Sequence, residues 1–124
     1  MGDSDTTVEE VRKAVRDFTK ERDWEQFHNP KDVSLALSIE VSEVLEHFRF
    51  KTNKEVEEYL SKQENKKELS HEIADVFWFV LRLSDVCGVD LTKALHEKLE
   101  LSAKKYPVEK VKGLPHKYTY YENE

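Results

Sequence analysis

The chain has 124 residues, which fits one domain with a single modest hydrophobic core. Its net charge of −6 argues against a general affinity for nucleic acid polymers, and no apolar run is long enough to cross a bilayer. The N-terminal MGDSDTTVEE has no apolar signal-peptide core, and the single cysteine excludes an intramolecular disulfide. We therefore expect a cytoplasmic protein that binds neither nucleic acid polymers nor membranes.

Only three glycines and three prolines are present, which favours long helices. Valines and a phenylalanine at three- and four-residue spacing predict a first helix over residues 7–22. A loop of aromatic and polar residues, DWEQFHNP, follows. Asn29 then has the character of an N-cap and Pro30 that of a first helical residue, which predicts a second helix over 30–49.

The second half of the chain continues the helical pattern. Thr52 with Glu55 three residues on is a capping-box pattern, which predicts a short helix over 52–60. After the polar connection SKQENK, a helix over 66–87 should stop at Gly88, and Asp90 should cap a helix over 91–105. No strand is predicted.

We therefore expect residues 1–107 to form one all-α domain, a four-helix bundle with a short extra helix. Residues 108–124 have no helical period and should form an extended or disordered tail.

Two pairs of acids stand among the apolar residues of the two longest predicted helices. Glu40 and Glu43 lie in LALSIEVSEVLEHF, and Glu72 and Asp75 lie in SHEIADVFWFVLRL. Residues three apart share a helix face, so antiparallel packing of these helices would bring four carboxylates together. An oxygen-only ligand set suits a hard cation such as Mg²⁺ or Mn²⁺.

Other interpretations of these acids stay open on the residues alone. Solvated carboxylates and intramolecular ion pairs also fit the pattern, since helical acids are usually exposed and inward acids can pair. Glu68-x-x-His71 matches half of a ferritin-like di-iron motif, but the second helix has no matching half. Cys87, at the end of an apolar run, is expected to be buried as a small hydrophobe.

The acid spacing resembles the ExxE…ExxD signature of the all-α, MazG-like nucleotide pyrophosphohydrolases. RDFTKERDWEQFHNPKD, ELSHEIADV and KKYP are similar to segments of the dCTP pyrophosphatase branch of that family. The resemblance covers about residues 8–107. It implies Mg²⁺-dependent hydrolysis of a nucleoside triphosphate to the monophosphate and pyrophosphate, by a dimer or a tetramer.

The resemblance also implies roles for individual residues. The metal ligands and catalytic acids would be Glu40, Glu43, Glu72 and Asp75. The base would bind at Trp24, His28, Phe50 and Phe79, and the phosphates at Lys98, Ser102 and Lys105. At three of these positions the residue differs from the one expected in the dCTP pyrophosphatase branch, which would have Trp at 50, Tyr at 79 and Asn at 102. A carboxylate not fully used in coordination could accept the proton of the attacking water; the sequence does not decide which acid this is, and we take Glu43 as the candidate.

The leading hypothesis is hydrolysis of dCTP or a modified dCTP, in cleaning of the nucleotide pool. One alternative keeps the reaction and changes the substrate to another pyrimidine triphosphate or a phosphoribosyl-nucleotide. Another is a non-enzymatic helical dimerisation module whose acids form ion pairs. Lys105 also has a second interpretation, as a cation favoured at a helix C-terminus.

Overall fold

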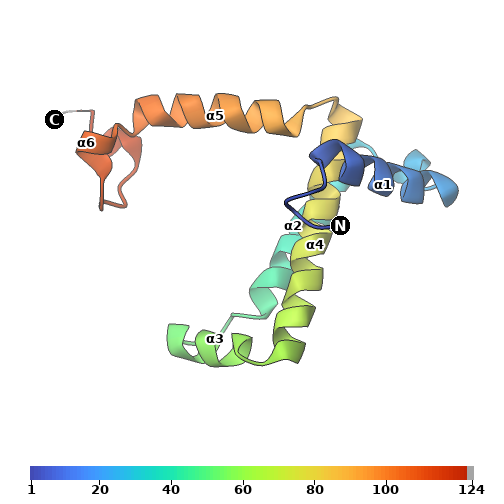
Figure 1. The fold of residues 1–124 in the computed structure, drawn as a ribbon, viewed down its shortest axis with the longest axis horizontal. Helices are drawn as coiled ribbons and strands as arrows, with labels where there is room; N and C mark the ends of the chain where they lie inside the picture. Colours follow the sequence, from blue (N-terminus) through green and yellow to red (C-terminus); the bar gives the residue numbers. More distant parts are fainter. Residues whose placement is uncertain (123–124) are drawn as a thin grey trace. The chain divides into compact units, whose positions relative to one another are not determined.

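The computed structural model describes residues 1–122, and these are helical with no strand among them (Figure 1). The all-α prediction is therefore confirmed for this part of the chain. The elements are α1 (Val8–Glu21), η1 (Glu25–Phe27), α2 (Pro30–Glu46), α3 (Asn53–Leu60), α4 (Gln63–Cys87), α5 (Leu91–Lys105), α6 (Val108–Val111) and η2 (Tyr118–Tyr120).

Helix boundaries follow local capping chemistry. The Asn29 side chain accepts a hydrogen bond from the Asp32 amide, with Pro30 at the first turn of α2. Thr52 forms the predicted capping box with Glu55 at the start of α3. Gly88 closes α4 in the left-handed region at φ 67°, which glycine adopts without a Cβ penalty.

Two helix ends differ from the prediction. α4 begins at Gln63, three residues early, because the Asn65 side chain donates to the Tyr59 carbonyl at 2.9 Å and ties this segment to the end of α3. α2 ends at Glu46 rather than at residue 49, and the chain turns over residues 47–50. The expectation for Cys87 was wrong: it is exposed, as the last residue of α4.

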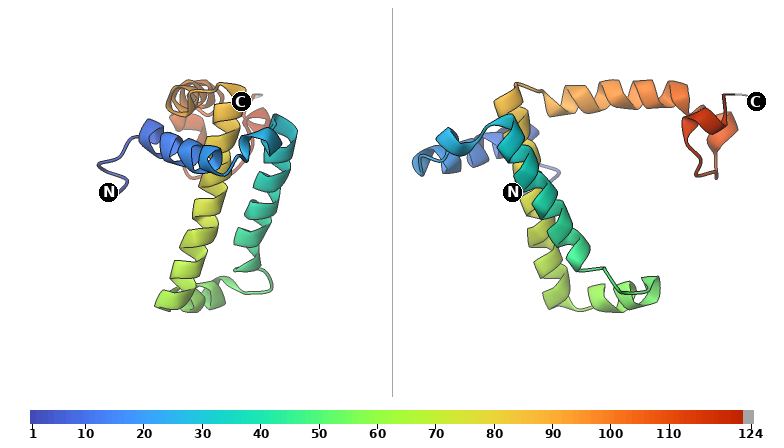
Figure 2. Two further views of the ribbon diagram at one scale, coloured as in Figure 1. Left: turned by 90° about the vertical axis from the view of Figure 1, so that its right-hand side faces the viewer. Right: turned by 180° about the vertical axis from the view of Figure 1, so that it is seen from behind.

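The chain divides into two compact units, Met1–Gly88 and a second unit that begins at Val89. In the first unit α2 and α4 run antiparallel side by side, and α1 and α3 also pack on α4 (Figures 1 and 2). Antiparallel packing of α2 and α4 is the arrangement expected to bring the acids of the two helices together. The four-helix bundle as such stays a prediction.

The core of the first unit is small. Val33 of α2 and Leu69 and Leu81 of α4 are buried, and Thr19 of α1 is fully buried with its hydroxyl donating to the Val15 carbonyl at 2.9 Å. Many larger apolar side chains stay exposed on the single chain, among them Leu35, Ile39 and Leu45 of α2 and Ile73 and Phe77 of α4. These side chains leave much apolar surface of the first unit uncovered.

The second unit comprises α5, α6 and η2. Tyr121 is its buried aromatic, and the Lys105 ammonium lies 4.7 Å from the centroid of the Tyr118 ring. The described part of the predicted tail thus contains one short helix and one 3₁₀ turn; residues 123–124 lie outside the described range. The predicted domain boundary at residue 107 stays a prediction. No helix within residues 1–122 combines the length and apolar character that crossing a membrane requires.

Candidate metal and nucleotide site

Three of the four predicted acids converge between α2 and α4. Glu40 comes from α2, and Glu72 and Asp75 come from one face of α4; one carboxylate oxygen of each lies within 4.8 Å of the others. The i, i+3 spacing and the antiparallel packing produce this cluster together. Such a group of oxygens is close enough to share one cation.

The cluster carries uncompensated negative charge. Partial burial raises the pKa of Glu40, and the charges of Asp75, Glu72 and Glu43 raise it further. None of the ion pairs among residues 1–122 includes any of these four acids. The ion-pair interpretation of the acids therefore finds no support in the described chain.

This donor set fits a divalent cation. The three clustered residues offer only carboxylate oxygens, which hard ions such as Mg²⁺ and Mn²⁺ prefer. A divalent ion would remove the repulsion that raises the pKa of Glu40. The cluster contains no histidine, and the two residues of the half di-iron motif, Glu68 and His71, are exposed. The donor chemistry thus favours a hard ion over a di-iron centre.

Glu43 stands apart from the other three acids. It is exposed, and its oxygens are not part of the 4.8 Å cluster, although its charge contributes to the raised pKa of Glu40 one turn away. Glu43 therefore lies next to the three clustered acids without being one of them.

Trp24 lies in the loop between α1 and α2, as the last residue before η1. It is 45% exposed, and its ring packs edge-on against Phe18 with centroids 5.9 Å apart. Phe18 in turn packs edge-on against Trp78 of α4 at 4.9 Å. Phe18, itself packed on Trp78, therefore covers one side of the Trp24 ring. The exposed part of the ring is accessible to a ligand.

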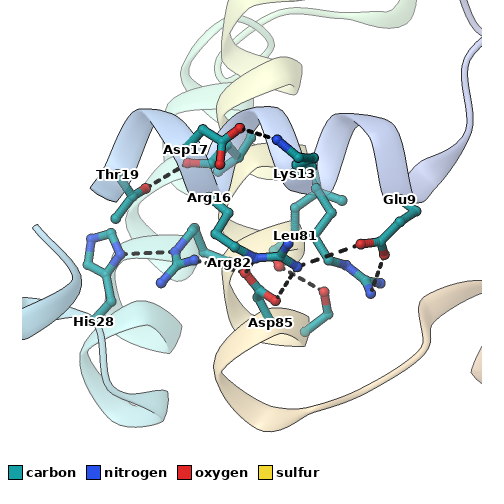
Figure 3. Close-up of polar contacts among 12 residues, drawn as sticks. Glu9, Lys13, Arg16, Asp17, Thr19, His28, Leu81, Arg82 and Asp85 are labelled. Carbon is teal, nitrogen blue, oxygen red and sulfur yellow. Dashed lines mark hydrogen bonds and ion pairs between the residues drawn. The ribbon is translucent and has the colours of Figure 1, made fainter. Parts of the chain in front are cut away.

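His28, in the same loop, joins a polar network that ties three segments together (Figure 3). The Arg82 Nε donates to His28 Nδ1 at 3.0 Å, and Arg82 Nη1 donates to Asp85 Oδ2 at 3.1 Å. Arg16 of α1 then binds both Asp85 oxygens, at 2.8 Å each. Sequence reasoning missed this network, although an arginine inside the apolar run of α4 was its one visible signal.

We predict that Asp85→Asn lowers the free energy of unfolding by about 2 kcal/mol at neutral pH. The substitution removes the carboxylate that serves two arginines, one of them nearly fully buried. The hydrogen bonds from Arg16 hold the pKa of Asp85 below its usual value, so its stabilisation is present above pH 3.8 and is lost as pH falls through the folded-state pKa.

Urea unfolding of both proteins across this pH range tests the prediction, and the difference between them should shrink in acid. Asp17→Asn, at an exposed ion pair with Lys13, is the matched control and should change stability little. Equal effects of the two substitutions would contradict the structural role of the network.

Phe50 follows α2 at the opposite end from His28. α2 has 17 residues, so on the order of 25 Å of helix separates the two positions. Phe50 is 89% exposed and has a φ of 64°, a strained conformation for a bulky residue. Phe79, the fourth predicted base-binding residue, lies on α4 one turn after Asp75 and is half-buried. The chain therefore does not bring His28 and Phe50 into one pocket, and their shared role stays a prediction.

Phe50→Gly should be more stable than Phe50→Ala by about 1 kcal/mol, because glycine adopts a positive φ without the Cβ penalty. Both variants should bind nucleotide more weakly if Phe50 contacts the base. Thermal unfolding and KM for the two variants separate strain from binding. Equal stabilities of the glycine and alanine variants would show that the backbone is not strained at this position.

The three predicted phosphate-binding residues, Lys98, Ser102 and Lys105, all lie on α5 in the second unit. Lys98 is exposed, and Ser102 is half-buried, with its carbonyl accepting the Tyr106 amide at 2.9 Å. Within that unit, Lys98 and Ser102 are one turn apart and Ser102 and Lys105 three residues apart, so they form a continuous polar strip on the helix. Their contact with phosphates stays a prediction.

The fold and the site thus define an all-α protein in which two antiparallel helices bring three carboxylates together, and no ion pair within residues 1–122 involves these acids. Comparison with known proteins identifies the family. The chain belongs to the MazG-like family, whose model matches residues 35–120.

The chain is also similar to named relatives. It is 36% identical over 113 residues to dCTP pyrophosphatase 1 of Rattus norvegicus, with 91% of this chain and 66% of the relative covered. It is 35% identical over 113 residues to dCTP pyrophosphatase 1 of Homo sapiens, at the same coverage. The chain thus spans about two thirds of the length of these relatives.

A solved structure supports the same fold. The crystal structure of a pyrophosphatase from Archaeoglobus fulgidus superposes with a TM-score of 0.74 at 37% sequence identity. The match covers 80% of this chain and 91% of the archaeal one. The likeness therefore extends over most of both proteins.

Proposed function

We propose that this protein is a Mg²⁺-dependent nucleoside triphosphate pyrophosphohydrolase that converts dCTP or a modified dCTP to the monophosphate and pyrophosphate. The observation that carries the proposal is the convergence of Glu40, Glu72 and Asp75, none of which forms an ion pair within residues 1–122. Similarity to dCTP pyrophosphatases over most of the chain supports the choice of substrate.

Each acid has a role in this reaction. Glu40, Glu72 and Asp75 would hold Mg²⁺, which when bound neutralises the triphosphate and lowers the pKa of a water molecule. Glu43, outside the cluster and exposed, accepts the proton of the water that attacks the α-phosphorus. The packing of α2 against α4 holds the carboxylates of the cluster in position relative to one another.

Base and phosphate contacts come from residues outside the cluster. The exposed surface of Trp24 offers a plane on which a flat base stacks. Lys98 stabilises charge on the leaving pyrophosphate, with Ser102 and Lys105 in support. Phe50, Phe79 and Ser102 replace the residues expected in the dCTP pyrophosphatase branch, so the choice of base is the part of the proposal that most needs measurement.

We also propose that the active species is a homo-oligomer. Leu35, Ile39 and Leu45 of α2 are each more than half exposed on one chain. A second copy would cover such apolar surface. Light scattering after size exclusion should show a dimer or a tetramer, and a monomer would refute this part.

A nucleotide panel tests the proposed function. The protein is incubated with Mg²⁺ and each of the four dNTPs, UTP, CTP, 5-methyl-dCTP or a phosphoribosyl-nucleotide, and pyrophosphate is measured. We expect release from dCTP or its modified form. Release from another nucleotide alone would support the alternative substrate, and release from none would leave the helical dimerisation module as the better account.

A further inference from the structure

His28 accepts a hydrogen bond from a group that can only donate. The Arg82 Nε lies 3.0 Å from His28 Nδ1 (Figure 3), and a guanidinium has no lone pair to offer and stays protonated in proteins. Nδ1 must therefore carry the acceptor lone pair. A neutral imidazole has one proton on its ring nitrogens, so the proton of His28 resides on Nε2, on the side of the ring away from Arg82.

Burial and an ion-pair network fix the position of the Arg82 side chain beside His28. Its side chain is only 4% exposed, although it carries a full charge. Asp85 compensates that charge from the next turn of α4, and Arg16 of α1 fixes Asp85 through two bonds of 2.8 Å. Burying an arginine is costly unless all its partners are in place, so this arrangement keeps the Nε–H aimed at the loop.

The network also opposes a charged His28. Burial and the charge of Arg82 lower the pKa of the imidazole, while Glu25 in the same loop acts weakly in the other direction. Arg16, Glu25, His28, Arg82, Asp85 and Val86 together line a pocket of about 300 Å³. With Nδ1 occupied and Nε2 protonated, His28 has no free lone pair, and it therefore acts as a donor and not as a general base.

Arg82 is also placed in register with the acid cluster. It follows Asp75 by seven residues, which on a helix is two turns along the same face, on the order of 10 Å. A nucleoside whose α-phosphate lies at the acids extends over such a distance. The Nε2–H donor of His28 would then lie close to the base of such a nucleotide, at this end of α4.

We propose that Arg82 is a positioning residue that locks His28 as an Nε2–H donor and thereby favours a pyrimidine whose N3 is an acceptor. Cytosine offers two adjacent acceptors there, the carbonyl O2 and the unprotonated N3. Uracil and thymine carry a proton on N3, which would face the donor. The part of this inference that concerns the base rests on the proposed function; the part that concerns the tautomer does not.

Nitrogen-15 NMR of the full chain with labelled histidine tests the tautomer without any nucleotide, with the His28 signals assigned by their loss in His28→Gln. We expect Nε2 protonated and Nδ1 as a hydrogen-bonded acceptor in the wild type, and a mixture of tautomers in Arg82→Met. A proton on Nδ1 in the wild type, or spectra unchanged by Arg82→Met, would overturn the proposal even if the enzyme is active.

Kinetics test the consequence for the base. Arg82→Met should lower the ratio of kcat/KM for dCTP to that for dUTP about tenfold, mainly through KM for dCTP. Arg82→Gln, which keeps an N–H donor, should restore part of the ratio and covers the case in which the methionine variant does not fold. Lys13→Met removes an exposed charge from α1 and should leave the ratio unchanged. An equal loss of kcat on both nucleotides in the two Arg82 variants would show a purely structural role and refute the inference.

Discussion

Asp75→Asn should lower kcat/KM for the preferred nucleotide on the order of 10³-fold, the scale of several kcal/mol of transition-state stabilisation from a bound metal ion. Glu40→Gln should have a similar effect, because each acid supplies one oxygen to the 4.8 Å cluster. Pyrophosphate release under saturating Mg²⁺ measures the loss, and circular dichroism should show unchanged helicity.

Glu57→Gln, at an exposed position of α3, is the matched control for removal of one negative charge. It should keep wild-type activity. If either acid of the cluster can be neutralised with activity retained, the assigned metal site is wrong. Glu43→Gln separates proton transfer from metal binding. Because Glu43 lies outside the cluster, this substitution should lower kcat while Mg²⁺ binding persists.

Saturating Mg²⁺ should stabilise the wild-type protein by about 4 kcal/mol at a thousandfold excess over Kd, which raises the melting temperature on the order of 10 °C. The reason is that the folded chain alone brings three carboxylates within 4.8 Å. Asp75→Asn should abolish most of this shift. The melting temperature is measured with Mg²⁺ and with a chelator, at one fixed protein concentration.

The pH dependence of the same shift follows from Glu40. Its pKa is raised in the folded chain, so its contribution to stability is fully present below pH 4.5 and is lost as pH rises through the folded-state pKa. Mg²⁺ competes with that proton, and its stabilising effect should therefore grow with pH across this window. No shift on addition of Mg²⁺ or Mn²⁺ at neutral pH would favour the ion-pair alternative.

Much of the fold was predictable because its signals are local. Asn29 with Pro30, Thr52 with Glu55, and Gly88 each specify a helix end through chemistry within one turn, and the structure confirms them. Three of the four acids of the predicted cluster also converge, as expected for acid pairs on two antiparallel helices, but Glu43 lies outside the cluster although it shares the i, i+3 spacing with Glu40.

Other features depend on contacts that local patterns do not record. Arg82 and His28 are 54 residues apart in the chain, and nothing near either residue reveals their hydrogen bond. The early start of α4 depends on one Asn65 contact across a turn. The positive φ of Phe50 is likewise set by the path of the chain between α2 and α3 rather than by the residue itself.

The most direct test of the central claim is hydrolysis of dCTP with Mg²⁺ in oxygen-18-labelled water, with the products analysed by mass spectrometry. Acids arranged to direct a water at the α-phosphorus predict one labelled oxygen in dCMP and none in pyrophosphate. Label in pyrophosphate, or release of orthophosphate, would place the attack at another phosphorus and contradict the proposed reaction.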